Sequence, residues 1–306
     1  MALLDGKVVL ITGGGRGIGR ETAILAARHG AKVVVNDLGG GIHGEGADKA
    51  PAQEVVDLIK SAGGQAVANF DSVTDLRAVG RMAQQAMDTF GGLHAVSNPA
   101  GILRDRMAHN MTEEEWDGIM QVHLRGHFNV VRATIGHFRS QQDGVYVMWS
   151  STSGLIGNVG QSNYGAAKMG IAGFSRIIAL EGARNNVRSN ALAPGAATRM
   201  TDSVPRDEET AKRREAMRDI QSPVRPAELA VALMSDAAKA ISGQIFGVGG
   251  YNLSIYSQPR PIHTYSRDGG WTADAIVRDF FPLAEKDYTP LGRMTPQPPI
   301  PVPAKA

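Results

Sequence analysis

The chain has 306 residues, a formal net charge of +2 and no cysteine, which excludes disulfides, thiolate metal sites and a cysteine nucleophile. Hydrophobic residues make up 42% and charged residues 20%; these values are typical of a globular protein of one or two domains, and the scattered Lys and Arg residues disfavour nucleic-acid binding. No apolar run approaches the roughly 20 residues that span a bilayer, and the N-terminus has no export pattern, so we expect a cytoplasmic protein that does not enter membranes.

Short β-branched segments alternate with longer helical patterns through the first 250 residues. Because these segments are apolar almost throughout and are separated by helices, we predict a parallel sheet covered on both faces. The predicted fold is α/β, a Rossmann-type doubly wound parallel sheet that forms one catalytic domain over residues 1–250. The predicted strands are residues 7–12, 32–36, 65–69, 93–97, 145–150, 189–192 and 243–248.

A lid insertion is predicted near residues 197–226, where the rhythm of strands and helices is interrupted. An acidic run at 207–209 precedes a basic run at 212–214, an order that suits a helix aligned with its dipole. The apolar side chains of this segment either line a flexible lid or pack a helix against the core. They are Met200, Val204, Met217 and Ile220.

Residues 251–306 are predicted to form a C-terminal extension with one helix near 272–281. Five prolines fall within residues 295–306, so extended chain is expected at the end. The extension either covers the substrate pocket or contacts a neighbouring subunit.

A glycine-rich loop follows the first predicted strand and leads into a helical pattern at 20–29. Its glycines let the chain turn tightly and bring the backbone against a pyrophosphate, and the helix N-terminus offers unpaired N–H groups to the same anion. A flexible glycine turn is the alternative, but the strand–loop–helix context favours a dinucleotide site. The loop residues predicted to contact the cofactor are Gly13, Arg16, Gly17, Ile18 and Gly19.

The second predicted strand is followed by Asp37, whose carboxylate can accept hydrogen bonds from both ribose hydroxyls of an adenosine and would repel a 2′-phosphate. Arg16 is the opposing signal, because a base in the glycine loop could reach such a phosphate. NAD is therefore predicted in preference to NADP. Asp71, after the third strand, either hydrogen-bonds adenine or caps a turn. Ser72 and Val73 beside it are included in the predicted cofactor site.

Three side chains form a predicted catalytic group. Ser151 follows a strand, where ligands bind in sheets of this kind, and Tyr164 and Lys168 share one face of the next helix. The ammonium and an oxidised nicotinamide are expected to lower the pKa of the phenol, so that Tyr164 can exchange a proton with an alcohol while Ser151 bonds the substrate oxygen. A surface pair on a helix is the alternative. No metal site is predicted.

These motifs resemble the short-chain dehydrogenase/reductase family over residues 5–250. The segments that carry the resemblance are Thr12–Gly19, Asn98–Gly101, Ser151, Tyr164–Lys168 and Pro194–Gly195. A narrower resemblance is to the (3R)-hydroxyacyl-CoA dehydrogenase domain of peroxisomal multifunctional enzymes, also called 17β-hydroxysteroid dehydrogenase type 4. The segments behind it are Val34–Gly40, Gly101–Arg106, Val122–Gly126 and Gly157–Gln161.

The resemblance implies further contacts to the cofactor and marks two departures. Thr198 would hydrogen-bond the carboxamide, and Val122 would pack near the nicotinamide. Pro99 stands where the family usually has asparagine, and His123 stands where its fourth catalytic residue is commonly asparagine. His123 either takes part in proton relay or makes a structural hydrogen bond. The further cofactor residues implied by the resemblance are Asn98, Ala100, Gly101, Val122, Tyr164, Lys168, Pro194, Gly195 and Thr198.

The resemblance implies an NAD-dependent oxidoreductase that interconverts a secondary alcohol and a ketone. The expected substrate is a 3-hydroxyacyl-CoA from lipid or sterol side-chain degradation; a 17β-hydroxysteroid is the alternative, and an NAD(H)-sensing or scaffold protein ranks lower. Arg104, Arg106 and the 212–214 run either meet CoA phosphates or are solvated. The resemblance also implies a homodimer or homotetramer, because family relatives pair the helix predicted at 163–183 across a two-fold axis. Its small residues, Gly170 among them, permit such close approach, although packing on the sheet would also favour them.

Overall fold

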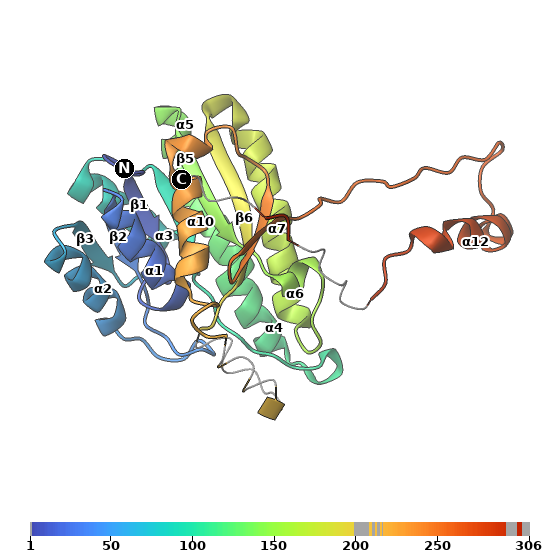
Figure 1. Ribbon diagram of the computed structural model, residues 1–306, viewed down its shortest axis with the longest axis horizontal. Helices are drawn as coiled ribbons and strands as arrows, with labels where there is room; N and C mark the ends of the chain where they lie inside the picture. Colours follow the sequence, from blue (N-terminus) through green and yellow to red (C-terminus); the bar gives the residue numbers. More distant parts are fainter. Residues whose placement is uncertain are drawn as a thin grey trace. The chain divides into compact units, whose positions relative to one another are not determined.

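The fold is built on a single eight-stranded sheet (Figure 1). The computed structural model describes residues 2–198, 208–209, 212, 215, 217–291 and 299–301. The strand order is β3-β2-β1-β4-β5-β6-β7-β8, and all neighbours are parallel except β8, which runs antiparallel to β7. The strands are β1 (Val8–Ile11), β2 (Lys32–Asn36), β3 (Gln65–Asn69), β4 (Ala95–Asn98), β5 (Gly144–Trp149), β6 (Val187–Gly195), β7 (Ile245–Gly249) and β8 (Asn252–Ile255).

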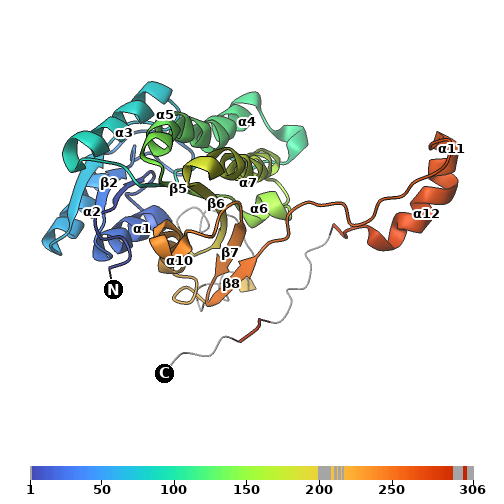
Figure 2. The ribbon, with the colours of Figure 1, turned by 90° about the horizontal axis from the view of Figure 1, so that it is seen from above.

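Helices cover both faces of this sheet, as Figure 2 shows. One face carries α1 (Gly17–Arg28), α2 (Ala50–Ser61) and α10 (Val224–Met234), and the other carries α3 (Leu76–Phe90), α5 (Gly126–Gln141) and α7 (Ser162–Gly182). The shorter elements of this part are η1 (Ala108–Asn110), α4 (Glu113–Met120), the π-helix η2 (Gln121–Arg125), α6 (Thr152–Leu155), η3 (Ala183–Asn185) and η4 (Asp236–Ala238).

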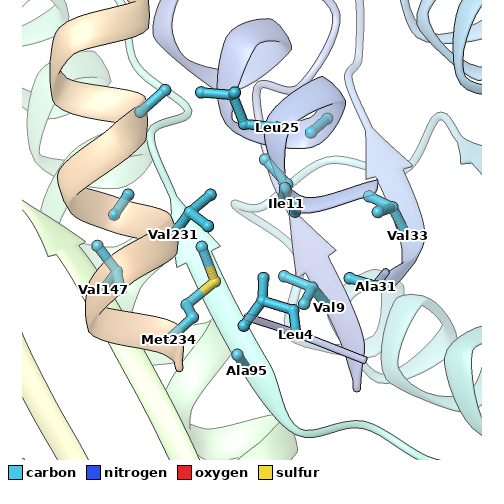
Figure 3. Close-up of a cluster of buried hydrophobic side chains, with 14 of the residues drawn as sticks. Leu4, Val9, Ile11, Leu25, Ala31, Val33, Ala95, Val147, Val231 and Met234 are labelled. Carbon is cyan, nitrogen blue, oxygen red and sulfur yellow. The ribbon is translucent and has the colours of Figure 1, made fainter. Parts of the chain in front are cut away.

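The strands are apolar throughout because both of their faces are buried. In β1, Val9 and Ile11 belong to the cluster shared with α1 and α10, whereas Val8 and Leu10 belong to the cluster shared with α3 and α5. Figure 3 shows the first cluster, in which Val231 of α10 lies close to the β1 side chains. Each fully buried aliphatic side chain contributes roughly 1.5–3 kcal/mol, so the two clusters hold the sheet rigid beneath the site.

The predicted fold class is confirmed, and all seven predicted strands exist: those at 32–36 and 65–69 have the predicted bounds, and the other five are shifted at their ends. The strand β8 was not predicted. Its four residues alternate polar and apolar side chains, but so short a run directly after Gly249 and Gly250 resembles a turn as much as a strand. Register fixes β8 at the sheet edge, with Phe246 opposite Ile255.

The chain divides into two compact units, Met1–Tyr256 and Ser257–Ala306. The second unit contains α11 (Ala273–Ala275), the π-helix η5 (Ile276–Phe280), α12 (Phe281–Ala284) and η6 (Glu285–Asp287). The ring of Phe280 meets the rings of Tyr265 and Trp271 edge-on, so this unit has a small aromatic cluster of its own. The assignment of residues 1–250 to a catalytic domain and 251–306 to an extension stays a prediction.

The predicted lid near 197–226 lies partly outside the described residues, which do not include Met200, Val204, Asp207, Arg213 or Arg214. Of the described residues, Lys212 pairs with Glu208 at 2.6 Å, one turn apart, and Ile220 lies against Gly250. The lid therefore stays a prediction. Within the described part of the chain, no helix has the length and apolar character needed to cross a membrane.

Candidate active site

The glycine loop between β1 and α1 is packed too tightly for side chains. Gly13 has φ +57°, and a Cβ on it would lie 2.8 Å from the Cα of Ala100; a Cβ on Gly19 would lie 2.0 Å from the carbonyl oxygen of Gly13. Arg16, which directly precedes α1, makes no side-chain cap, and the first turn carries no acidic residue. A helix N-terminus of this kind fits a diphosphate, because its unpaired N–H groups and dipole favour an anion.

Asp37 follows β2 and lies over this loop. Its carboxylate accepts hydrogen bonds from the N–H groups of Gly15 at 2.8 Å and of Gly39 at 2.7 Å. Arg16 turns towards the loop that follows: one guanidinium nitrogen donates to the carbonyl of Gly40 at 3.4 Å, and another lies 3.8 Å from the carboxylate of Asp48. The contact with Asp48 was not predicted from the sequence, because the residues around Asp48 do not indicate that this segment folds back against the glycine loop.

The segment predicted to meet adenine is held at the end of β3. The carboxylate of Asp71 pairs with Arg81, and its other oxygen accepts from the side-chain amide of Asn69 at 3.3 Å. The Ser72 hydroxyl bonds the Thr74 hydroxyl at 2.9 Å, and the neighbouring Val73 is buried. These contacts fix the loop, but Asp71 is engaged by Arg81, a partner that the sequence alone did not suggest.

The end of β4 lies directly against the glycine loop. The hydroxyl of Thr12 donates to the side-chain carbonyl of Asn98, and Ala100 touches Gly13. At the next position, a Cβ on Gly101 would lie 2.4 Å from the ring of His123. The chain from Asn98 to Gly101 therefore joins the cofactor loop to the predicted catalytic group.

The end of β6 approaches the same loop from the other side. Pro194 and Gly195 are the last residues of β6 and pair with Val248 and Gly249 of β7. A Cβ on Gly17 would lie 3.6 Å from the methyl group of Thr198. Of the residues that the family resemblance implies at this end of the sheet, Thr198 thus lies close to the start of α1.

The three predicted catalytic side chains lie together between β5 and α7. Ser151 directly precedes α6, its hydroxyl accepts from the Ser153 N–H at 3.1 Å, and it is near enough to the Tyr164 phenol to act on the pKa of that group. The Lys168 ammonium lies 5.3 Å from the centroid of the Tyr164 ring and donates to the Trp149 carbonyl at 2.7 Å. This carbonyl at the end of β5 anchors the ammonium beside the phenol.

Burial dominates the proton affinities of this group. It raises the pKa of Tyr164 to about 12, although the hydrogen bond from Ser151 opposes the shift, and the charge of Asp105 adds to it. Burial likewise lowers the pKa of Lys168 to about 7. Without a cofactor, burial is thus the largest influence on the phenol, and it raises the pKa that the ammonium and an oxidised nicotinamide together are expected to lower. The effect of an oxidised nicotinamide stays a prediction.

His123 lies in the π-helix η2, a helical irregularity that is frequent at functional sites. Its Nε2 lies 2.8 Å from the carbonyl oxygen and 3.2 Å from the nitrogen of Ile102, while its Nδ1 has no hydrogen-bond partner among the described residues. The ring meets Tyr164 edge-on at 5.1 Å between centroids, and Val122 packs in the same cluster. Burial and then the charge of Lys168 lower the pKa of His123 well below 6.5, so the imidazole is neutral.

Sequence reasoning missed a buried residue that anchors Tyr164. The amide of Asn163 donates to the carbonyls of Arg104 at 2.9 Å and Glu115 at 3.1 Å, and its oxygen accepts from the Tyr164 N–H at 2.7 Å. It thereby ties the start of α7 to the loop after β4. The sequence signal was the position of Asn163 directly before Tyr164. That position indicates no role until the fold shows which groups the side chain contacts.

The two arginines considered for CoA phosphates are bound to their own chain. Arg104 donates to the carbonyls of His43 at 3.0 Å and Glu114 at 2.9 Å, and Arg106 pairs with Glu115 at 2.7 Å. These contacts favour the reading in which the arginines fix the loop, although Arg106 remains half exposed.

Comparison with known proteins identifies relatives of the whole chain. Residues 7–209 match the family model described as short chain dehydrogenase. The hydroxyacyl-CoA dehydrogenase ChsB1 of Mycobacterium tuberculosis is 37% identical over 297 residues, which cover 91% of this chain and 89% of the relative. A crystal structure of a short chain dehydrogenase from Mycobacterium avium matches with a TM-score of 0.81 at 36% identity, over 98% of this chain and 99% of that one.

Peroxisomal multifunctional enzyme type 2 of Mus musculus is 49% identical over 200 residues, or 65% of this chain. The match covers only 27% of the mouse enzyme, so it concerns one part of a much longer protein. Together with the mycobacterial relative, it confirms the resemblance to hydroxyacyl-CoA dehydrogenases that the motifs indicated.

Proposed function

The chain belongs to the short-chain dehydrogenase family, and on that premise we propose that it interconverts a 3-hydroxyacyl-CoA and its 3-keto form with NAD. The observation that carries the proposal is the grouping of Ser151, Tyr164 and Lys168 after β5, at the same edge of the parallel sheet as the glycine loop that follows β1. A protein that only senses or stores a dinucleotide has no need of these three side chains together.

Each of the three side chains has a distinct task in the proposed reaction. Tyr164 accepts the hydroxyl proton when the alcohol is oxidised and returns it when the ketone is reduced. Ser151 donates a hydrogen bond to the substrate oxygen, where charge develops during the reaction. Lys168 stabilises the phenolate with its ammonium, which the Trp149 carbonyl holds in place at 2.7 Å. The nicotinamide, when bound, supplies the hydride acceptor or donor.

The preference for NAD over NADP rests on two carboxylates. Asp37 occupies the end of β2, where it would meet the ribose of the adenosine and repel a 2′-phosphate. Arg16, the cation that could attract this phosphate, is turned to Asp48 and the carbonyl of Gly40. Both features lower the affinity of the site for a phosphorylated ribose.

The substrate class rests on the relatives. The name of the mycobacterial relative specifies hydroxyacyl-CoA, and that relative aligns with nearly the whole chain, which supports a thioester of this class here. In the experiment, a panel of 3-hydroxyacyl-CoAs and hydroxysteroids is offered with NAD, and turnover is measured from the absorbance of the reduced nicotinamide. We expect acyl-CoAs to give the higher kcat/KM, and steroids ahead by orders of magnitude would overturn the proposal.

The role of Tyr164 is tested separately. Tyr164→Phe removes the hydroxyl that exchanges the proton but keeps the ring, so turnover should be lost while NADH binding, measured by fluorescence, stays close to wild type. Turnover retained in this variant would reject the assigned proton transfer.

A further inference from the structure

We propose that His127 is a positioning residue of the active site, whose imidazole joins the π-helical turn carrying His123 to the strand end that anchors Lys168. The inference rests on the proposed alcohol oxidation, because it concerns the side chains that would carry out that reaction. His127 belongs to neither the glycine loop nor the predicted catalytic group. It lies on the first turn of α5 and is 1% exposed.

Both nitrogens of the His127 ring contact backbone. Nδ1 donates to the carbonyl oxygen of His123 at 2.7 Å, and Nε2 accepts from the N–H of Trp149 at 3.4 Å. One side of the ring therefore requires a donor and the other an acceptor, which fixes the neutral imidazole with its proton on Nδ1. Burial, followed by the charge of Lys168, lowers the pKa of His127 to about 3, which keeps the imidazole neutral at working pH.

The two backbone groups that His127 holds lie where regular structure is interrupted. In the π-turn the N–H of Gly126 reaches back to the carbonyl of Gln121, so the ordinary helical pairing around His123 is displaced. On the sheet side, β4 ends with Asn98 opposite Met148, one residue short of Trp149. The imidazole supplies hydrogen bonds at both places.

Each backbone group leads directly to a reacting side chain. The Trp149 carbonyl accepts from the Lys168 ammonium at 2.7 Å, and the His123 ring packs edge-on against Tyr164. A shift of either backbone segment would thus change the distance between phenol and ammonium. The titratable groups around His127 are His123 from η2, Lys168 from α7 and Tyr146, which lines the same small cavity from β5.

Three variants at this position separate the two hydrogen bonds. His127→Leu removes both, His127→Asn retains a donor near the place of Nδ1, and His127→Gln places its polar group near Nε2. His137→Leu is the matched control, because His137 lies on the same helix and also bonds a backbone carbonyl, that of Leu93 at 3.2 Å, outside the active site. The readouts are kcat and KM across pH, the NADH dissociation constant, and the pKa of Lys168 followed by NMR of labelled lysine.

We expect His127→Leu to lower kcat by about tenfold to a hundredfold, as small misplacements of reacting groups do, with little change in the affinity for NADH. The pH profile of kcat and the NMR pKa of Lys168 should move together. His127→Asn should restore most of kcat, His127→Gln should not, and His137→Leu should change stability alone. If His127→Leu does not fold, the Asn and Gln variants still decide between the two hydrogen bonds.

Three results would overturn the proposal: an unchanged pKa of Lys168 in His127→Leu and His127→Gln, equal kcat in the Asn and Gln variants, or a loss of kcat in His137→Leu as large as in His127→Leu. Failure of the proposed function looks different. In that case the wild-type protein turns over no member of the substrate panel, while the NMR titration of Lys168 still reports whether His127 positions it.

Discussion

Burial of the Lys168 side chain, which the proposed reaction needs, should lower the free energy of unfolding of the protein. The pKa of Lys168 falls from 10.5 to about 7 on burial, and at about 1.4 kcal/mol for each pH unit this amounts to about 5 kcal/mol against folding at low pH. Replacement by methionine, which is similar in length and uncharged, removes this cost. It also leaves the Trp149 carbonyl without its donor, at a cost of about 1–3 kcal/mol. Lys168→Met should therefore be more stable than wild type by about 2–4 kcal/mol at pH 6, and inactive.

Unfolding in urea between pH 6 and pH 9, without cofactor, measures the effect. Between pH 7 and pH 10.5 the unfolded chain binds a proton at Lys168 that the folded chain does not, so wild-type stability should rise with pH there. The free-energy cost of burying the Lys168 side chain is complete below pH 7 and vanishes above pH 10.5. The gap between variant and wild type should accordingly shrink as pH rises. A variant less stable than wild type at pH 6, or a gap independent of pH, would refute the reasoning.

Three further changes test the cofactor loop and the assembly. Gly13→Ala should weaken NADH binding by about tenfold or more, because its Cβ would lie 2.8 Å from Ala100; unaltered affinity in a fluorescence titration would contradict the assigned loop. Asp37→Ala should raise kcat/KM for NADP relative to NAD, and adding Asp48→Ala should raise it further by releasing Arg16, whereas a wild-type preference for NADP would contradict the assignment. Leu180→Glu, on the exposed face of α7, should shift an expected dimer or tetramer towards monomer in sedimentation, and wild-type protein that sediments as a monomer would reject the predicted assembly.

The sheet was predictable because its signal is local and repeated. Each parallel strand is a short apolar run, and Val33 to Val35 of β2 are buried on both faces for the reason that predicted them. The strand β8 lacks that signal, since all four of its residues are exposed. The π-helix η2 was equally hidden, because an extra residue within a helix does not disturb the apolar pattern enough to identify it.

The site residues were predicted from their spacing along the sequence. Such spacing does not predict contacts between side chains that are far apart in the sequence. Tyr164 and Lys168 are one turn apart, so their proximity follows from any helix. The contacts of Arg16 with Asp48 and of Asp71 with Arg81 depend on how loops return, and no local pattern specifies them. The raised pKa of Tyr164 depends mainly on burial, which the tertiary fold sets, so reasoning from the nearby ammonium and the nicotinamide did not include its largest cause.

The pKa values also indicate in which protonation state the chain by itself holds the two groups of the proposed reaction. With a pKa of about 12, Tyr164 holds its proton near neutral pH and is ready to donate it to a ketone. Lys168, with a pKa of about 7, is only partly charged there, so its support for a phenolate weakens as pH rises through neutrality. Proton acceptance by Tyr164 from an alcohol therefore requires positive charge beyond what this chain supplies. On the proposed mechanism Tyr164 is therefore protonated in the chain by itself, and alcohol oxidation depends on the charge of the oxidised cofactor to favour the phenolate.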